Sequence, residues 1–342
     1  MEEIRIGESV KSSPKVSVIT PLFKAANHIG ESLESLFSQT FQDFEAVLVN
    51  DGSPDSEELE EALKPFADRI IYIKQPNQGA SVARNTAIRN ANGEILAFLD
   101  HDDIWFPEYL ESQLRAREEK NCDMIYCNAK LFGTNSLPGK TYMAKAPSNG
   151  VVNSVSLLEG KCNPITSGTM VSRKAVVDVG MFDETLPRIG FEDFDLWFRL
   201  ARAGTKIDYQ QKILIKYRVH HDSLSGEPMK IAERDLVVAE HSRKVYKLTP
   251  DEERAYFKRF EEANAFLNLL KAKEKLSSNE FVESVELFKN AQRYYKSNKL
   301  RIMIPMLMLN PAFSLRLLKL LRPGEYNIVV SNGNKTDKDT QS

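Results

Sequence analysis

Several features that would assign a chain of 342 residues to a special class are scarce or missing here. The three cysteines, Cys122, Cys127 and Cys162, form no even disulfide framework and show no metal-type spacing, which fits a reducing compartment. The formal net charge is −2, so no overall basic charge points to nucleic acid. No run of about 18 apolar residues occurs, and the polar N-terminus has no signal-peptide core. We therefore expect a cytoplasmic globular protein.

The first hundred residues alternate between strand-like and helix-like patterns. Short apolar runs predict strands, and apolar residues three and four apart predict helices between them. The predicted strands cover 16–20, 44–49, 70–73 and 95–99, and the predicted helices cover 28–38, 56–67 and 79–90. This alternation indicates an α/β fold with a mostly parallel sheet and right-handed crossovers.

An acidic cluster, Asp100-His101-Asp102-Asp103, follows the apolar run 95–99 directly. Carboxylates at the end of a buried strand repel one another and are costly to bury without partners. A divalent cation such as Mg²⁺ or Mn²⁺, which binds one or two carboxylates together with substrate phosphates, would relieve that repulsion. A solvated turn that caps the next helix explains the cluster equally well.

Polar segments also follow two other predicted strands, at residues 21–27 and 50–55. In parallel sheets, ligands bind at the carboxyl ends of the strands, so the three segments together predict one site. In the second segment, Asp51 could accept the imide N–H of a uracil or thymine ring. A simple β-turn is the commoner use of an isolated Asp-Gly-Ser sequence.

The remainder of the chain divides into a less regular middle and a helical end. The middle predicts strands at 124–128, 169–172 and 213–219 and helices at 174–179 and 191–203. Capping-box patterns at Thr249–Glu252 and Ser277–Glu280 precede predicted helices at 251–275 and 280–297. We expect a flexible arm (1–14), a catalytic domain (15–228), an all-helical C-terminal region (229–328) and a disordered tail (329–342).

An ordered series of motifs resembles the family 2 glycosyltransferases over roughly residues 14–225. The motifs are Val16-Ser17-Val18-Ile19-Thr20-Pro21, Ser38-Gln39-Thr40-Phe41, Asp51-Gly52-Ser53, Asn77-Gln78-Gly79-Ala80-Ser81-Val82-Ala83-Arg84-Asn85, Leu99-Asp100-His101-Asp102-Asp103, Gly180-Met181-Phe182-Asp183-Glu184 and Glu192-Asp193-Phe194-Asp195-Leu196-Trp197. The resemblance implies a GT-A fold, a nucleotide-sugar donor, most often a UDP-sugar, and an inverting transfer. It implies a hexosyl or N-acetylhexosaminyl transfer to a glycan or lipid-linked hydroxyl, in the synthesis of surface polysaccharide or glycoconjugate.

The resemblance also assigns roles to residues. Asp193 matches the catalytic base, with Glu192 as the fallback, and Asp51 matches the Asp that binds the nucleotide base. Asp102 matches the residue that contacts Mn²⁺ or Mg²⁺. Asp100 is expected near the ribose or sugar, and Asp103 as a sugar or supporting contact. His220 (or His221) is expected near the metal or diphosphate. The other residues expected in donor binding are Pro21, Phe23, Gly79, Arg84 and His101.

The residue chemistry agrees with this resemblance. Inverting transfer requires a base for the acceptor hydroxyl, and a carboxylate at a helix N-terminus, as expected for Asp193, is stabilised as the anion. Arg84 could contact phosphate or form a salt bridge. The family often has Asp where Asn50 stands, and an aromatic residue and Asn where Phe23-Lys24 stands. The processive signature of cellulose-type synthases is absent, which favours single-sugar transfer.

The segment 293–322 is basic and strongly apolar, and it contains no Asp or Glu. It could lie on an anionic membrane, which we expect for residues 299–322 on the cytoplasmic face, or pack as a helix pair. An inactive nucleotide-sugar or glycan-binding protein is the alternative function, against which Asp51, Asp102 and Asp193 argue. A nucleotidylyltransferase is disfavoured because residues 20–27 lack a glycine-rich phosphate loop with a basic residue.

Overall fold

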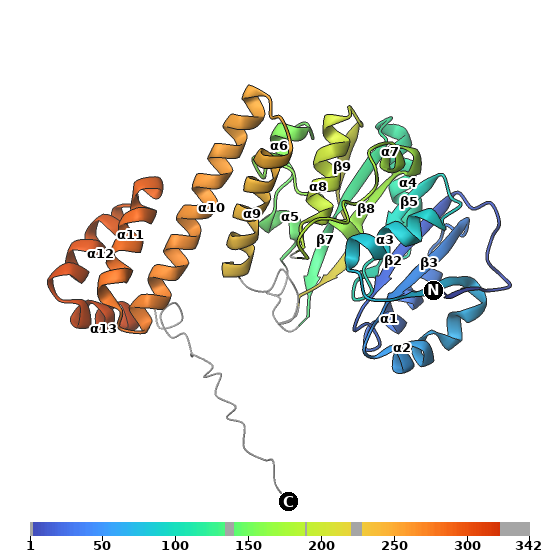
Figure 1. Cartoon of the computed structure of the whole chain (residues 1–342), viewed down its shortest axis with the longest axis horizontal. Helices are drawn as coiled ribbons and strands as arrows, with labels where there is room; N and C mark the ends of the chain where they lie inside the picture. The colour runs from blue at the N-terminus through green and yellow to red at the C-terminus, as the bar shows by residue number, and fades with distance from the viewer. Residues whose placement is uncertain (1–2, 134–139, 189, 220–227, 322–342) are drawn as a thin grey trace, which may run out of the picture. The chain divides into compact units, whose positions relative to one another are not determined.

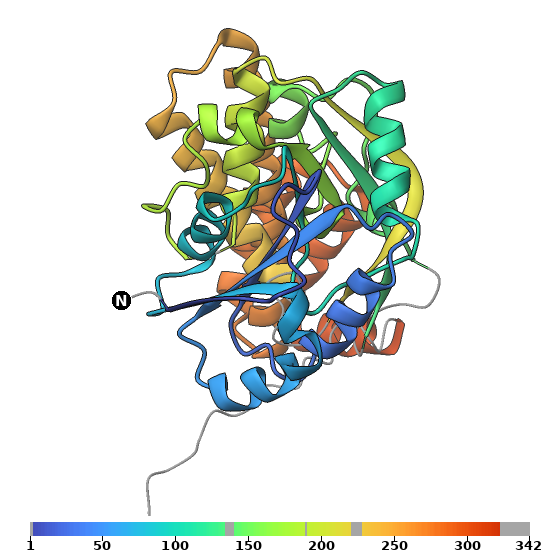
Figure 2. The same ribbon diagram turned by 90° about the vertical axis from the view of Figure 1, so that its right-hand side faces the viewer.

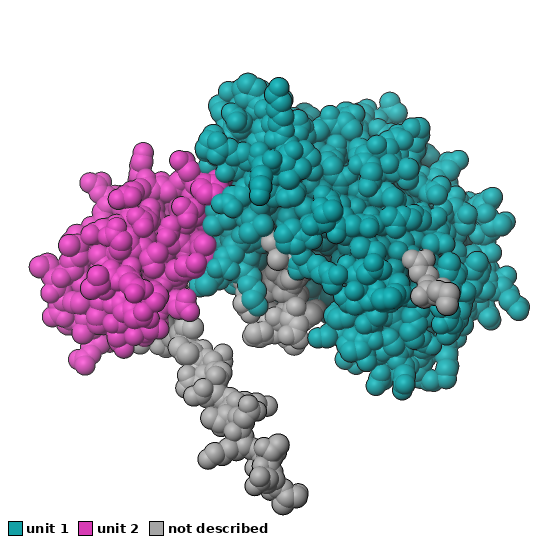
Figure 3. Space-filling model, viewed as in Figure 1, with its two compact units in different colours: residues 1–259 teal, residues 260–342 magenta. Residues whose placement is uncertain are grey.

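The computed structural model describes residues 3–133, 140–188, 190–219 and 228–321. The chain forms two compact units, Met1–Arg259 and Phe260–Ser342, which Figure 3 colours separately. The helix α9 (Pro228–Val245) belongs to the first unit, since Val238 packs against Leu186 and Phe191. The division between the units therefore follows Arg259, whereas the domain boundary expected at 228 stays a prediction.

A nine-stranded sheet runs through the first unit in the order β1-β4-β3-β2-β5-β8-β7-β9-β6 (Figure 1). The strands are β1 Glu3–Ile6, β2 Val16–Leu22, β3 Phe44–Asp51, β4 Ile70–Gln75, β5 Ile95–Phe98, β6 Ile104–Trp105, β7 Met124–Phe132, β8 Thr169–Ser172 and β9 Ile207–Arg218. The central strands β4, β3, β2 and β5 pair in parallel, as the alternation of elements predicted. This parallel part brings the ends of β2, β3 and β5 to one edge.

The sheet as a whole is mixed, with parallel pairs at its centre and antiparallel pairs beside them. Beyond the central strands, β7 pairs with β9 in parallel, whereas β1–β4, β5–β8, β6–β9 and β7–β8 are antiparallel. The βαβ pattern ends at β5, and β8 returns beside it from a loop-rich stretch instead of a helical crossover. The predicted parallel core is therefore confirmed, and antiparallel strands extend the sheet beyond it.

Helices cover both faces of the sheet, which gives three layers (Figures 1 and 2). Alternate strand residues point to opposite faces, so Val18 and Leu48 join one core while Ile19 and Val47 join the other. One face packs against α1 Ile29–Phe37, α2 Ser56–Leu63, the 3₁₀ turn Lys64–Arg69 and α4 Tyr109–Glu119. The other packs against α3 Ala80–Arg89, α6 Ser154–Leu158, α7 Arg173–Asp178 and α8 Glu192–Arg202.

Residues 3–6 form the edge strand β1, although the sequence predicted a flexible arm there. They pair antiparallel with β4, and the N–H groups of Gly7 and Ser9 bond to the carbonyls of Ile70 and Asp68 at 3.0 and 2.7 Å. Ile4 and Ile6 are exposed, so the strand is held by backbone bonds rather than by burial. Glu3-Ile4-Arg5-Ile6 alternates polar and apolar residues as a strand does, but four residues are the shortest run that indicates one.

The second unit is helical, as expected for the C-terminal appendage. Its helices are α11 Phe281–Tyr295, α12 Asn298–Leu309 and α13 Pro311–Leu321, preceded by the last part of α10 Pro250–Ser277. Phe288, Leu276 and Leu307 form its core. Among the described residues, no helix combines the length and apolar character needed to cross a bilayer. The tail predicted at 329–342 lies outside the described residues.

Candidate active site

The loops that follow β2, β3 and β5 meet at one edge of the sheet. The backbone N–H groups of Lys24 and Ala26, after β2, donate to Ser53 Oγ and Asp55 Oδ2, after β3, at 2.6 and 3.0 Å. Burial opposes ionisation of Asp55, but the bonds from Ser53 and Ala26 outweigh it, and the pKa of Asp55 is lowered. The electrostatic effect of His101, which follows β5, lowers the pKa of Asp55 further. The three polar segments singled out in the sequence are therefore neighbours.

Asp51 is 3% exposed and organises the loop that leads into α3. Its Oδ1 accepts bonds from Gln75 Nε2 and the Gln78 N–H at 2.7 and 2.8 Å, and Oδ2 accepts the Gly79 N–H at 2.7 Å. A carboxylate has about four acceptor positions, so one further donor can bind. The predicted contact with a nucleotide base stays a prediction, and it must share Asp51 with this loop.

Gly52 and Gly79 both have a positive φ and lie close to other residues, so a larger residue would be strained at either position. Gly52 has φ +60°, and a Cβ there would lie 2.6 Å from the Asn77 backbone nitrogen. Gly79 has φ +94°, and its Cβ would lie 2.9 Å from Nε of Arg188, whose Nη1 donates to Asn77 Oδ1 at 2.8 Å. Arg188 is therefore a basic residue beside the predicted donor-binding glycine that the sequence reasoning did not single out.

Arg84 joins two acidic motifs that lie far apart in the chain. Its Nη2 donates to Asp100 Oδ1 and its Nη1 to Glu192 Oε1, both at 2.8 Å. The Arg84 side chain is 7% exposed, and burial alone would lower its pKa, but Asp100 and Glu192 raise the pKa above its ordinary value. Of the two uses that the sequence left open, this structure contains the salt bridge.

The acidic cluster is fixed in place by Arg218, the last residue of β9. The Arg218 N–H donates to Asp103 Oδ1 at 2.9 Å, and its Nε donates to the Asp102 carbonyl at 2.8 Å. Asp103 is 1% exposed, and among the described residues its Oδ2 has no hydrogen-bond partner. Burial, with the charges of Asp102 and Asp100, raises the pKa of Asp103 well above its ordinary value. A cation here would offset that repulsion.

The donor chemistry at this cluster fits a divalent cation. Asp102 is partly exposed beside the unpartnered oxygen of Asp103, and both provide the hard oxygen ligands that Mg²⁺ and Mn²⁺ prefer. Within the described ranges, no group of three or more His, Cys, Asp and Glu residues could hold a metal by itself. A cation bound here would therefore need further ligands from outside the described residues, and substrate phosphates commonly supply them at sites built on one or two carboxylates. His220 and His221 lie outside the described residues.

Asp193 occupies the first turn of α8, as predicted. Its Oδ2 accepts a bond from Thr166 Oγ1 at 2.8 Å, and its Oδ1 accepts the Phe194 N–H at 2.7 Å. Burial and the neighbouring Glu192 raise the pKa of Asp193 above its ordinary value of 3.8, whereas Thr166 and Arg84 act in the opposite direction. A carboxylate with a raised pKa accepts a proton more readily, which suits a general base.

The 3₁₀ turn Thr166–Gly168 supports both acidic motifs, although no sequence pattern indicated it. Thr166 bonds to Asp193, while Ser167 Oγ accepts the Asp100 N–H at 3.1 Å and the Ser167 carbonyl accepts Trp105 Nε1 at 2.7 Å. Tyr142, another residue not singled out, lies within electrostatic range of Asp193. Burial, followed by Asp193, raises the pKa of Tyr142 to about 12, so its phenol stays neutral.

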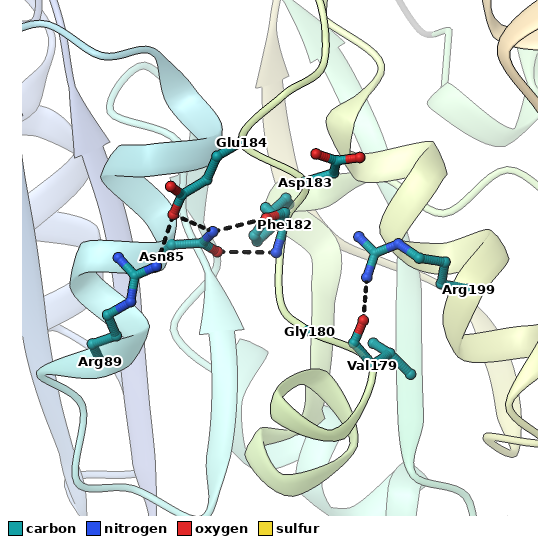
Figure 4. Close-up of a pocket in the computed structure, with 8 residues that line it drawn as sticks. All are labelled: Asn85, Arg89, Val179, Gly180, Phe182, Asp183, Glu184 and Arg199. Carbon is teal, nitrogen blue, oxygen red and sulfur yellow. Dashed lines mark hydrogen bonds and ion pairs between the residues drawn. The ribbon is translucent and has the colours of Figure 1, made fainter. Parts of the chain in front are cut away.

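A pocket of about 350 Å³ lies between α3 and α8 (Figure 4). It is lined by α3 residues Asn85 and Arg89, the segment 179–184 and Arg199 of α8. Asn85 Oδ1 accepts the Phe182 N–H at 2.9 Å, and Glu184 Oε1 accepts bonds from Asn85 and Arg89. Asn85, Arg89 and Glu184 are thus bonded to one another, and none of the residues predicted for the site lines the pocket. Pro21, in β2, is partly buried, and Phe23, in the loop that follows β2, is exposed.

A family model described as "Glycosyl transferase family 2" matches residues 17–180. Residues 17–180 of this chain belong to the family 2 glycosyltransferases. An uncharacterized glycosyltransferase of Rickettsia bellii (strain RML369-C) is 31% identical over 304 residues, which cover 85% of this chain. The match covers 41% of that relative, and matches to two other Rickettsia relatives cover 35% and 34% of them. TuaG of Bacillus subtilis (strain 168), named for teichuronic acid biosynthesis, is 28% identical to this chain. The match covers 66% of this chain and 87% of TuaG.

Two solved structures share the fold of this family 2 glycosyltransferase. S. aureus TarS 1–349 in complex with UDP-GlcNAc is 20% identical with a TM-score of 0.55, over 92% of this chain and 93% of that chain. The mannosyltransferase PcManGT from Pyrobaculum calidifontis, in complex with GDP-Man and Mn²⁺, is 17% identical with a TM-score of 0.58, over 91% and 88%. The fold is therefore GT-A with a C-terminal helical region, which confirms the expected fold class.

Proposed function

We propose that this glycosyltransferase moves a single sugar, with inversion, from a nucleotide-diphosphate sugar to a hydroxyl of a glycan or lipid-linked acceptor. The observation that best supports this proposal is the pair of salt bridges made by Arg84, because they hold Asp100 of the acidic cluster beside the Glu192-Asp193 motif. A diphosphate held by the first motif and an acceptor deprotonated by the second would then meet at one anomeric carbon. TarS and PcManGT, which share the fold, are described in complex with nucleotide sugars.

Asp193 acts as the base in this proposal. The carboxylate takes the proton of the acceptor hydroxyl while that oxygen forms a bond to the anomeric carbon. The bond from the anomeric carbon to the diphosphate oxygen breaks on the opposite face, and its electron pair leaves with the nucleoside diphosphate. Thr166 holds the carboxylate in position through its bond to Oδ2. Glu192 is less suited to this role, because its Oε1 is already paired with Arg84.

Asp102 would hold Mn²⁺ or Mg²⁺, with Asp103 beside it, and PcManGT supports this cofactor because its structure contains Mn²⁺. A bound divalent cation neutralises the charge that develops on the leaving diphosphate, so no general acid is needed. Asp51 and Gly79 would form the base-binding end of the donor site, with a preference for uracil. We further propose a hexose or N-acetylhexosamine as the sugar, and surface polysaccharide or glycoconjugate as the product, which the relative TuaG supports.

Calorimetric titration tests the donor site. UDP, GDP and dTDP are each titrated with Mn²⁺, with Mg²⁺ and with EDTA. We expect UDP to bind tightest and to weaken at least about tenfold in EDTA, since the cation contributes several kcal/mol of charge stabilisation. Asp102→Ala should bind UDP equally weakly with and without Mn²⁺. Asp43→Ala, an exposed acidic residue paired with Lys11, is the matched control and should bind as wild type does. Metal-independent UDP binding by the wild type would contradict the cofactor assignment.

A further inference from the structure

The helices α12 and α13 expose large apolar side chains on the faces that point away from their own core. In α12, Leu300, Ile304 and Leu307 are buried against the rest of the second unit. On the opposite side of the same helix, Ile302 is 64% exposed and Leu309 87%, and Met308, at the side of the helix, is 60% exposed. Surface helices of globular proteins normally carry polar residues on this face. The solvent side of α12 therefore carries large apolar residues beside its basic ones.

The same pattern continues in α13. Ser314 and Leu315 are buried, and Ser314 Oγ bonds back to the Met306 carbonyl at 2.9 Å, which fixes the turn between the helices. Phe313 is 60% exposed and Leu320 is 80% exposed. Leu309 and Phe313 thus flank this turn at its exposed end. Several large apolar side chains exposed on two consecutive helices indicate an interaction site.

The charged residues within α12 and α13 are all basic. Lys299 and Arg301 in α12 and Arg316 in α13 are exposed, and the sequence contains no acidic residue between Glu286 and Glu325. A basic, amphipathic helix pair of this composition matches an anionic bilayer, where apolar side chains enter the acyl boundary and cations contact the headgroups. The helices have 12 and 11 residues and are too short to span a bilayer, which needs about 20.

We propose that the α12–α13 surface, defined by Ile302, Met308, Leu309, Phe313 and Leu320 with Lys299, Arg301 and Arg316, docks on an anionic lipid bilayer. A second copy of the chain is a poorer occupant. A twofold contact would place the same cations opposite one another, which costs free energy through repulsion. The inference goes beyond the proposed function and does not depend on sugar transfer, since none of these residues belongs to the candidate active site.

Flotation of the full chain with lipid vesicles tests this proposal. Vesicles of pure phosphatidylcholine are compared with vesicles that contain about 30 mol% phosphatidylglycerol, a fraction on the order of that in anionic membranes. We expect binding to the anionic vesicles and none to the neutral ones. Binding should fall as salt is raised, because the cations act within a Debye length. Absence of binding to anionic vesicles at low salt would overturn the proposal.

Three variants locate the contact. Leu309→Glu/Phe313→Glu should abolish flotation by removing the apolar insertion. Arg301→Gln/Arg316→Gln should weaken it about 25-fold, or about fivefold for each cation. Val177→Glu, at an exposed apolar residue of α7 in the first unit, is the control and should float as wild type does. Circular dichroism with an unchanged thermal midpoint establishes that each variant is folded.

The alternative occupants give different results. If the surface instead binds a second copy, sedimentation equilibrium will show a wild-type dimer that Leu309→Glu/Phe313→Glu dissociates, without lipid binding. If it binds an acidic protein, vesicles will not float the chain at any anionic content. Either result, or equal flotation of all variants, overturns the proposal. Nucleotide titration of the same variants should be unchanged, so a failed donor site would be recognised separately.

Discussion

At the residue scale, Arg84 connects the acidic cluster to the first turn of α8. Its guanidinium is buried between the Asp100 and Glu192 carboxylates, and both ion-pair distances are 2.8 Å. Removing one partner of a buried ion pair leaves an uncompensated charge, which is far costlier than losing a surface pair. Here two carboxylates would lose the same cation.

The first prediction is therefore that Arg84→Met lowers the free energy of unfolding by about 3 kcal/mol. Arg89→Met, on the same helix, removes the exposed pair with Glu184 and should cost less than about 1 kcal/mol. Urea denaturation followed by circular dichroism measures both values. Equal, small losses in the two variants would mean that Arg84 does not hold the two motifs together.

Thr166 gives a second prediction at this scale, in the pH dependence of transfer. The base must be ionised to accept a proton, so kcat/KM falls as pH falls through the Asp193 pKa, which is raised. The Thr166 bond lowers that pKa, and Thr166→Val should therefore shift the acid limb to higher pH. Thr166→Ser keeps the hydroxyl and should leave the limb in place. Coincident limbs for the valine and serine variants would exclude a positioning role for Thr166.

The roles of single residues were predictable where a motif ended a strand or began a helix. Asp51, Asp100 and Asp193 could be located from the strand and helix patterns beside them. Thr166, Ser167 and Arg188 could not, since their importance depends on contacts with residues 27 to 111 positions away in the chain. No local pattern encodes such contacts.

At the scale of elements, the two predicted capping boxes behave differently. At Thr249–Glu252 both bonds form: the Thr249 N–H reaches Glu252 Oε2 at 2.9 Å, and the Glu252 N–H reaches Thr249 Oγ1 at 3.3 Å. The box predicted at Ser277–Glu280 is absent, because Asn279 has φ +64° and Glu280 becomes the N-cap without a side-chain cap bond. Glu280 pairs with Lys275 instead, a competing partner that the box pattern does not reveal.

The third prediction follows from this contrast. Thr249→Ala should lower the free energy of unfolding by about 1 kcal/mol, the usual contribution of an N-cap side chain. Ser278→Ala, at an exposed position of the box that does not form, should change it by less than about 0.5 kcal/mol. Thermal denaturation of the two variants measures the difference. Comparable losses would mean that the Thr249 bonds contribute nothing specific.

At the scale of the whole molecule, the candidate site depends on elements drawn from most of the first unit. The alternation of strands and helices predicted the parallel strands β2, β3, β4 and β5, and hence the edge where three loops meet. The strands β8 and β9 complete the site by carrying Thr166–Gly168 and Arg218 to that edge. Their order in the sheet could not be predicted, because strands outside a regular βαβ alternation can pair in several ways.

The measurement that tests the central claim most directly is turnover of a donor by wild type and by Asp193→Asn. Release of nucleoside diphosphate from UDP-sugars is followed with Mn²⁺, with water or a glycan as acceptor, and donor binding is measured by calorimetry on the same samples. We predict that Asp193→Asn abolishes release while donor affinity stays within about threefold, since the base acts on the acceptor rather than on the donor. Near-normal turnover by Asp193→Asn would contradict the account.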